Sequence, residues 1–259
     1  MALLPPLHLA GAWQMAIDAW MLEQRRPLLR FYRWRQFTLS LGHHQRRIEP
    51  QWWALARGGA VDLVRRPSGG RAVLHGGDLT YALVWPQAAG RREQVYRQAC
   101  RWLQEAFTAL GQPLQLGRQA SGQHRGGQPA SCFALSTAAD LVHADGTKRI
   151  GSAQHWHQGC LLQHGSIQLE PPAELWRQVF QAEAPALAPL PLHGEALEAA
   201  LIAAARRWLP CAAAGLVPGL LDAAALEACS RTARAFQIDL ASPEATIART
   251  TGASARPSG

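Results

Sequence analysis

The stretch Arg65–His75 reads Arg-Arg-Pro-Ser-Gly-Gly-Arg-Ala-Val-Leu-His and connects two segments that have the pattern of strands. The apolar run 61–64 precedes it, and residues 78–85 follow it with large apolar side chains at alternate positions. A plain hairpin needs only about two to five connecting residues, whereas this connection is longer and contains the pair Gly69-Gly70. Paired glycines let a backbone approach another molecule closely, and arginines offer forked donors for carboxylate, phosphate or carbonyl oxygens. The stretch therefore predicts a loop that holds a ligand, in preference to a glycine bulge with solvated arginines.

The composition indicates a basic protein with a sizeable core. The chain has 259 residues, 48% of them apolar, and a formal net charge of +8 that comes almost entirely from arginine. Such a charge suits nucleic acid, an anionic membrane or an acidic protein partner. We find no basic helix or zinc-ligand spacing that favours nucleic acid, and no apolar run of about 18 residues that favours a membrane. The five cysteines form no Cys-x-x-Cys pair, so we expect a reducing cytoplasm and no metal site, with a monomer as the default.

Hydrophobic periodicity predicts both helices and strands along the chain. We expect helices at 11–25, from 50, at 91–110, 173–180, 195–208 and 222–236, and strands at 28–32, 38–42, 61–64, 78–85, 141–143, 148–150, 160–162 and 166–169. The first two strands are expected to pair with each other, and the last two to be separated by a bend at Gly165. Strands that come mostly first and helices mostly last indicate an α+β fold with a mixed β-sheet flanked by helices.

Cys132 and Lys148 are the candidates for chemistry. A thiolate is a strong nucleophile near neutral pH, and a neighbouring ammonium favours the thiolate and can stabilise a developing oxyanion. Cys132 follows a loop rich in Gly, Gln, Ser and Arg, and Lys148, the only lysine, opens the run Lys-Arg-Ile-Gly-Ser-Ala-Gln at 148–154. With the Gly-rich loop, these residues could form an acyl-transfer site. The other cysteines are interpreted as core or inert residues, and Asp18 and Asp140 as structural.

Several motifs, in order over residues 11–170, resemble the biotin/lipoate A/B protein ligase family. They are the segments 27–34, 38–42, 65–75, 148–154 and 161–167. The pair Cys132-Phe133, shortly before a Lys-x-x-Gly-Ser-Ala-Gln motif, is similar to the cysteine-dependent octanoyltransferase branch of that family. The resemblance implies the family's ligase fold, with a catalytic domain over 1–210 and a helical extension over 211–238. The composition of the last residues, rich in Ala, Ser, Thr, Pro and Gly, predicts a disordered tail over 239–259.

Three features depart from the family's pattern, one of which is the lack of an aromatic residue in the segment 134–141. The acid that usually follows the loop histidine comes only at Asp78, because two glycines separate it from His75. His43 and His44 stand where the family more often has aromatic residues. No third ligand has a suitable spacing from this pair, so we interpret the two histidines as loop surface and not as metal ligands.

The resemblance implies a thioester route that needs no cofactor. The thiolate of Cys132 takes an octanoyl group from acyl carrier protein, and Lys148 lies against the acyl carbonyl. A lysine of a lipoyl-domain protein, such as the glycine cleavage H protein or a 2-oxoacid dehydrogenase E2, then receives the group as an amide. The substrate-binding residues that the resemblance implies are Arg66, Ser68, Gly69, Gly70, Arg71, Ala72, His75, Gly151, Ser152, Ala153, His164 and Gly165.

Two other functions fit parts of the pattern. An ATP-dependent lipoate–protein ligase of the same fold would require Mg²⁺ and would not require Cys132. A non-catalytic module would bind an acyl group or a lipoyl domain without performing chemistry. The presence of both Cys132 and Lys148 and the helical character after residue 169 favour the transferase.

Overall fold

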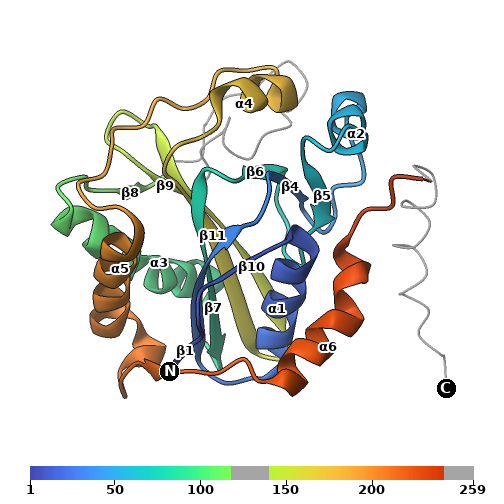
Figure 1. Ribbon diagram of the computed structural model, residues 1–259. Coiled ribbons are helices and arrows are strands. Elements are labelled where there is room, and N and C mark those ends of the chain that lie inside the picture. Colours follow the sequence, from blue (N-terminus) through green and yellow to red (C-terminus); the bar gives the residue numbers. More distant parts are fainter. Residues whose placement is uncertain (118–139, 242–259) are drawn as a thin grey trace.

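The computed structural model describes residues 1–117 and 140–241, which form two β-sheets flanked by helices (Figure 1). The larger sheet follows the order β12-β1-β3-β7-β11-β10-β9-β8, with β2 beside β3. Its strands are β1 (Ala2–Leu3), β2 (Leu7–Leu9), β3 (Leu28–Trp34), β7 (Asp78–Pro86), β8 (Gln115–Leu116), β9 (Asp140–Val142), β10 (Lys148–His157), β11 (Cys160–Gln168) and β12 (Val217–Pro218). The smaller sheet, in the order β5-β4-β6, contains β4 (Thr38–Leu41), β5 (Asp62–Arg65) and β6 (Val73–His75).

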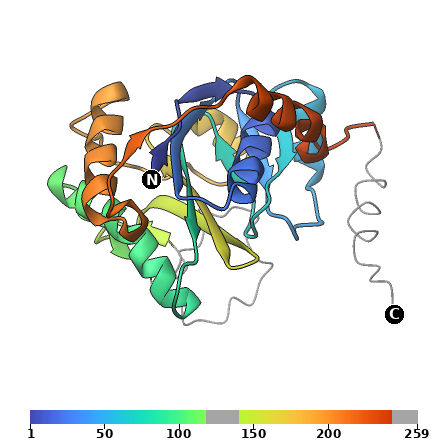
Figure 2. The same cartoon turned by 90° about the horizontal axis from the view of Figure 1, so that it is seen from below.

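Helices cover both faces of the larger sheet. The helices are α1 (Gly11–Glu23), α2 (Pro50–Arg57), α3 (Arg92–Ala109), α4 (Ala173–Phe180), α5 (Gly194–Trp208) and α6 (Ala223–Ala233). Helices α1 and α6 lie side by side on one face, and α3 and α5 cover the other (Figures 1 and 2). Helices α2 and α4 pack on the smaller sheet. The parallel and antiparallel pairings confirm the predicted α+β fold with a mixed sheet and flanking helices.

Strand β7 lies in the middle of the larger sheet, between β3 and β11. Its side chains alternate as predicted: Tyr81 and its alternate neighbours join the core under α3 and α5, whereas Ala82 and Val84 join the core under α1. Both faces are covered, so the polar residues Asp78 and Thr80 at the start of the strand are also buried. Buried polar groups need hydrogen-bond partners, and those partners build the site described below.

Two sequence predictions about strands are wrong. Strands β3 and β4 do not pair, because β3 belongs to the larger sheet and β4 to the smaller one. Their short connection fits a hairpin, but both edges of β3 are occupied by strands from elsewhere in the chain. The bend at Gly165 is absent, since β11 runs without interruption between β7 and β10. The glycine at 165 is explained by steric crowding instead, because an added Cβ would lie 2.6 Å from Ser152 Oγ and from Tyr81.

The C-terminal part of the described chain packs against its beginning. Strand β12, which the sequence analysis did not predict, pairs in parallel with β1, and α6 packs on α1. None of the helices in residues 1–117 and 140–241 is both long and apolar enough to cross a membrane. The predicted nucleophile Cys132 and residues 242–259 of the predicted tail lie outside the described residues.

Candidate functional site

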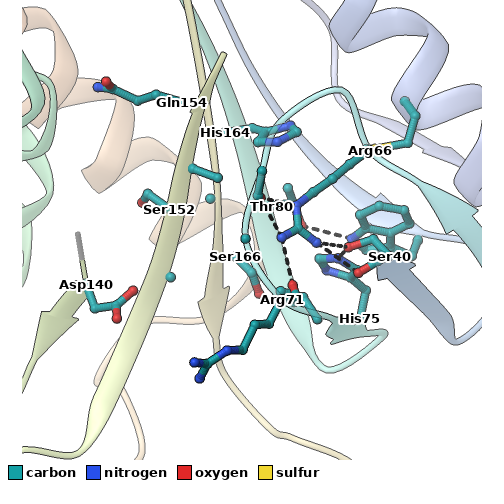
Figure 3. A pocket seen from close by; sticks show the side chains of 18 of the residues that line it. Ser40, Arg66, Arg71, His75, Thr80, Asp140, Ser152, Gln154, His164 and Ser166 are labelled. Atoms are coloured by element: carbon teal, nitrogen blue, oxygen red, sulfur yellow. Dashed lines mark hydrogen bonds between the residues drawn. The ribbon is translucent and has the colours of Figure 1, made fainter. Parts of the chain in front are cut away.

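A cavity of about 420 Å³, mostly apolar, lies between β10–β11 and the loop that connects β5 to β6 (Figure 3). We call residues 66–72 of that connection the glycine loop. Of the predicted substrate-binding residues, all except Ser68 and Ala72 line this cavity. Both exceptions are fully buried, so they support the loop from beneath. The fold thus brings together the two motifs, 66–75 and 151–165, that the sequence analysis combined.

Arg66 holds the glycine loop in shape from within. Its guanidinium donates to the carbonyl oxygens of Gly69 at 2.8 Å, Arg71 at 2.7 Å and Ser40 at 2.8 Å (Figure 3). The side chain is 5% exposed. The forked donors that the sequence analysis assigned to a ligand are therefore directed at carbonyl groups of the protein itself. Figure 3 shows that the Arg71 side chain, in contrast, extends away from these carbonyls.

A first chain of hydrogen bonds, Asp78–His75–Ser40, supports the loop beside Arg66. His75 Nδ1 donates to Asp78 Oδ2 at 2.8 Å, and Nε2 lies 2.9 Å from Ser40 Oγ, which also accepts from Arg66. Burial opposes ionisation of Asp78, but His75 and hydrogen bonds from Ser166 and the Gly76 amide outweigh it and lower the pKa of this carboxyl. The separation of His75 from its acid by two glycines therefore does not prevent the contact.

A second chain, Asp18–His164–Ser68, has the same order of groups. His164 Nδ1 lies 2.7 Å from Asp18 Oδ2, and Nε2 is hydrogen-bonded to Ser68 Oγ in the glycine loop. Asp18 is completely buried in α1, where Arg30 donates to it at 2.6 Å. Burial raises the pKa of Asp18, but Arg30 and His164 outweigh that effect, so the net shift is downward. Asp18 is thus a charged residue that positions His164.

The opposite wall of the cavity carries an ion pair between Lys148 and Asp140. Lys148 Nζ lies 2.7 Å from Asp140 Oδ1, and both side chains are almost completely buried. Strands β9 and β10 are antiparallel neighbours, with an irregular register between Lys148 and Ile150. Asp140 lines the cavity (Figure 3), whereas Lys148 does not line it and lies behind this carboxylate, to which it is paired. A buried ammonium at this place can stabilise negative charge that develops on a bound carbonyl.

The described cysteines are poorly suited to nucleophilic chemistry. Burial raises the pKa of Cys100 and of Cys211 to about 12, and it also raises the pKa values of Cys160 and Cys229. The thiolate is the reactive form, so the raised pKa values disfavour nucleophilic attack by these four thiols at neutral pH. Within the described chain, no group of three or more His, Cys, Asp or Glu side chains could hold a metal ion.

Sequence reasoning missed several residues of the site. Asp140 was interpreted as structural, although it lines the cavity and pairs with the predicted Lys148. Ser40, Thr80 and Gln154 also line the cavity. One sequence signal could have indicated this pair. The acid at 140 stands eight positions before the only lysine, on the other arm of a predicted hairpin. No local pattern distinguishes Ser40 or Thr80 from ordinary strand residues.

Comparison with known sequences identifies one family. The sequence model described as "Lipoyl protein ligase A/B catalytic domain" matches residues 10–187. Octanoyltransferase LipM of Carboxydothermus hydrogenoformans is 37% identical over 167 residues, which are 61% of this chain and 61% of that protein. Octanoyltransferase LipM of an Exiguobacterium species is 33% identical over 171 residues, 61% of this chain and 62% of the relative. The chain thus aligns with a little over three-fifths of the length of these curated relatives.

Solved structures share the fold at low sequence identity. A T. acidophilum protein regarded as a lipoate protein ligase, with bound lipoic acid, superposes with a TM-score of 0.75 and 16% identity, over 95% of this chain and 98% of the other. Lipoate-protein ligase A with bound ATP has a TM-score of 0.72 and 16% identity, over 95% and 97% of the two chains. These structures confirm the ligase fold that the resemblance implied.

Proposed function

Since this chain belongs to the lipoyl protein ligase A/B catalytic domain family, we propose that it is an octanoyltransferase of lipoate biosynthesis. It would move an octanoyl group from acyl carrier protein to a lysine of a lipoyl-domain protein. The geometric observation that carries the proposal is the buried Lys148–Asp140 pair beside an apolar cavity. The cavity's volume, about 420 Å³, falls in the range of roughly 300–1,000 Å³ that is usual for small-molecule sites. The relatives named octanoyltransferase support the same reaction.

The first step would form a thioester on Cys132. The thiolate attacks the carbonyl carbon of the octanoyl thioester, and the ammonium of Lys148 stabilises the resulting oxyanion. The C–S bond to the carrier then breaks, and the carrier's sulfur leaves as a thiolate that takes up a proton. Cys132 lies outside the described residues, and the four described cysteines have raised pKa values, which supports the remaining thiol as the nucleophile.

The second step would transfer the group to the acceptor. The deprotonated amine of a lipoyl-domain lysine attacks the Cys132 thioester. The C–S bond breaks, the nitrogen loses a proton to the departing Cys132 thiolate, and an amide forms. The glycine cleavage H protein and a 2-oxoacid dehydrogenase E2 are the acceptor types that we propose. The octanoyl chain would lie against Gly69, Gly70 and the 151–153 backbone, where the absence of large side chains leaves room for it.

Intact-protein mass spectrometry after mixing with octanoyl-acyl carrier protein, without ATP, tests the first step. The wild type should gain the mass of one octanoyl group, and hydroxylamine should remove it. Cys132→Ser should form no hydroxylamine-labile adduct. Cys160→Ser is the matched control, because Cys160 is a buried strand cysteine with a raised pKa, and it should be acylated like the wild type.

The alternatives predict other outcomes of the same assay. If no adduct forms but a lipoyl domain is modified when lipoate and Mg-ATP are supplied, the protein is a lipoate–protein ligase and the transferase proposal fails. If octanoyl groups reach neither the protein nor a lipoyl domain under any of these conditions, while the acyl donor still binds, a non-catalytic module is the better description.

A further inference from the structure

Four of the chain's ten histidines lie close together, near residues that line the cavity. We call His43, His44, His155 and His157 the histidine rim. His43 and His44 follow β4, and their rings pack edge to face with centroids 4.7 Å apart. His155 and His157 lie at alternate positions near the end of β10, so they share a face of the strand. His155 interacts electrostatically with the other three.

The rim connects the two walls of the cavity. On one side, the His43 amide donates to the carbonyl of Ser68 in the glycine loop at 2.8 Å. On the other, His155 directly follows Gln154, which lines the cavity. His155 also interacts electrostatically with His164, which lines the interior. Gln154 and His164 occupy the same end of the cavity in Figure 3. A partner that reaches this end of the cavity would therefore come close to the rim.

Within residues 1–117 and 140–241, the groups that act on His43 and His155 are cationic or neutral. Burial lowers the pKa of His43, and His44 and Arg65 lower it further. Burial likewise lowers the pKa of His155, followed by the effects of the other rim histidines and His164. Arg65 is held by the carbonyl oxygens of Gly42 at 2.9 Å and Gln45 at 2.7 Å. His43, His44 and His157 are exposed, so an arriving partner can reach them.

The rim is not suited to metal binding or to a nonpolar partner. Across the described residues, no cluster of His, Cys, Asp and Glu has the geometry of a metal site. The imidazoles of His43 and His155, on which no described carboxylate acts, can each take up a proton and donate a hydrogen bond to an anion. Phosphate and carboxylate oxygens accept such charge-assisted bonds.

We propose that the histidine rim is the docking surface for the acidic acyl carrier protein that donates the octanoyl group. This inference rests on the proposed function. The donor carries its thioester at the end of a phosphate-linked arm, so the phosphodiester and the carrier's carboxylates would face the rim while the acyl chain enters the cavity. The acceptor lysine brings no phosphate, and for that reason we assign the rim to the donor.

Docking would then be coupled to proton uptake. The rim histidines with lowered pKa values are mainly neutral at pH 7.5 in the free protein, and an anion beside them raises those values. Affinity for the carrier should therefore increase as the pH falls through the histidine range, by up to about tenfold for each pKa unit that the partner restores. The carrier's phosphodiester and carboxylates keep their charge over the same range.

Binding of the carrier with its arm but without an acyl group can be measured by fluorescence anisotropy at pH 6.0 and 7.5, so that no reaction occurs. The wild type should bind several-fold more tightly at pH 6.0. The variant H43Q/H44Q/H155Q/H157Q should lose this gain. His193→Gln is the matched control, because His193 is an exposed histidine at the start of α5 and should leave the gain unchanged.

Two results would overturn the inference: an undiminished gain at pH 6.0 in the fourfold variant, or a loss of binding to the lipoyl domain instead of the carrier. Acylation by octanoyl-N-acetylcysteamine, an uncharged thioester, separates docking from chemistry. The fourfold variant should be acylated by it at the wild-type rate. If even the wild type is not acylated, the proposed function fails. The binding experiment still tests whether the histidine rim is the docking surface for the carrier.

Discussion

The glycine loop is held from beneath by hydrogen bonds that end on Asp18 and Asp78, whereas the opposite wall of the cavity carries one buried ion pair, Lys148–Asp140. The partners on the loop side come from distant parts of the chain; Asp18 and His164, for example, are 146 positions apart. Those on the other wall belong to two neighbouring strands of one hairpin. The comparison suggests that the first wall fixes the shape of the cavity and the second supplies the charge for chemistry.

The first prediction tests the loop side through Asp18. Asp18→Asn removes the negative charge that faces Arg30 and leaves that guanidinium buried without it. Breaking a buried pair in this way costs about 3–5 kcal/mol. Urea unfolding should therefore show a loss of that size in the free energy of unfolding. Glu93→Gln, which breaks an exposed pair with Arg97 on α3, is the control and should have little effect.

The second prediction concerns the opposite wall. Lys148→Met should slow acylation by octanoyl-acyl carrier protein roughly 10²- to 10³-fold, the usual effect of removing one oxyanion donor. It also leaves the Asp140 carboxylate without the ammonium beside it, so the variant should be less stable as well. Rapid-quench mass spectrometry measures the acylation rate, and thermal unfolding measures the stability.

A double variant separates these two effects. Lys148→Met combined with Asp140→Leu replaces the buried pair by apolar groups, a change that is often neutral for stability. If stability returns while acylation stays slow, Lys148 acts in the reaction. Recovery of both stability and the acylation rate would mean that the pair only supports the fold. It would contradict the assignment of chemistry to this wall of the cavity.

The sequence was informative where function depends on short segments. Lys148, the 151–153 run and the glycine loop are contiguous motifs, and each lies at the cavity or beside it. It was uninformative where partners meet only through the fold. The pairing of β4 with β5 and β6, which places Ser40 beside His75, has no local signal, because the connection after β3 equally fits a hairpin. The assignment of Asp18 as structural is consistent with its burial, but its link to the cavity through His164 required the structure.

A smaller effect on stability is expected from adding one methyl group, and it should differ between the two walls. In Gly165→Ala the new Cβ would meet Ser152 Oγ and the ring of Tyr81 at 2.6 Å, and Tyr81 is completely buried. Such overpacking costs about 1–3 kcal/mol. Gly69→Ala is the matched change on the glycine loop, where an added Cβ meets nothing within 4 Å. Chemical denaturation should show a clear loss for the first variant and nearly none for the second; equal losses would contradict this picture of the two walls.

The smallest expected effect tests whether the Asp18–His164–Ser68 chain holds the glycine loop specifically or stabilises the whole domain. Ser68→Ala removes the hydroxyl that binds His164 Nε2, a loss of about 1 kcal/mol for one buried hydrogen bond. The His43 amide reports on the loop, because it donates to the Ser68 carbonyl at 2.8 Å. Hydrogen exchange of this amide should become faster in Ser68→Ala while amides in the middle of β7 keep their protection. A uniform increase over both regions would mean that the Asp18–His164–Ser68 chain stabilises the whole domain and does not specifically hold the loop.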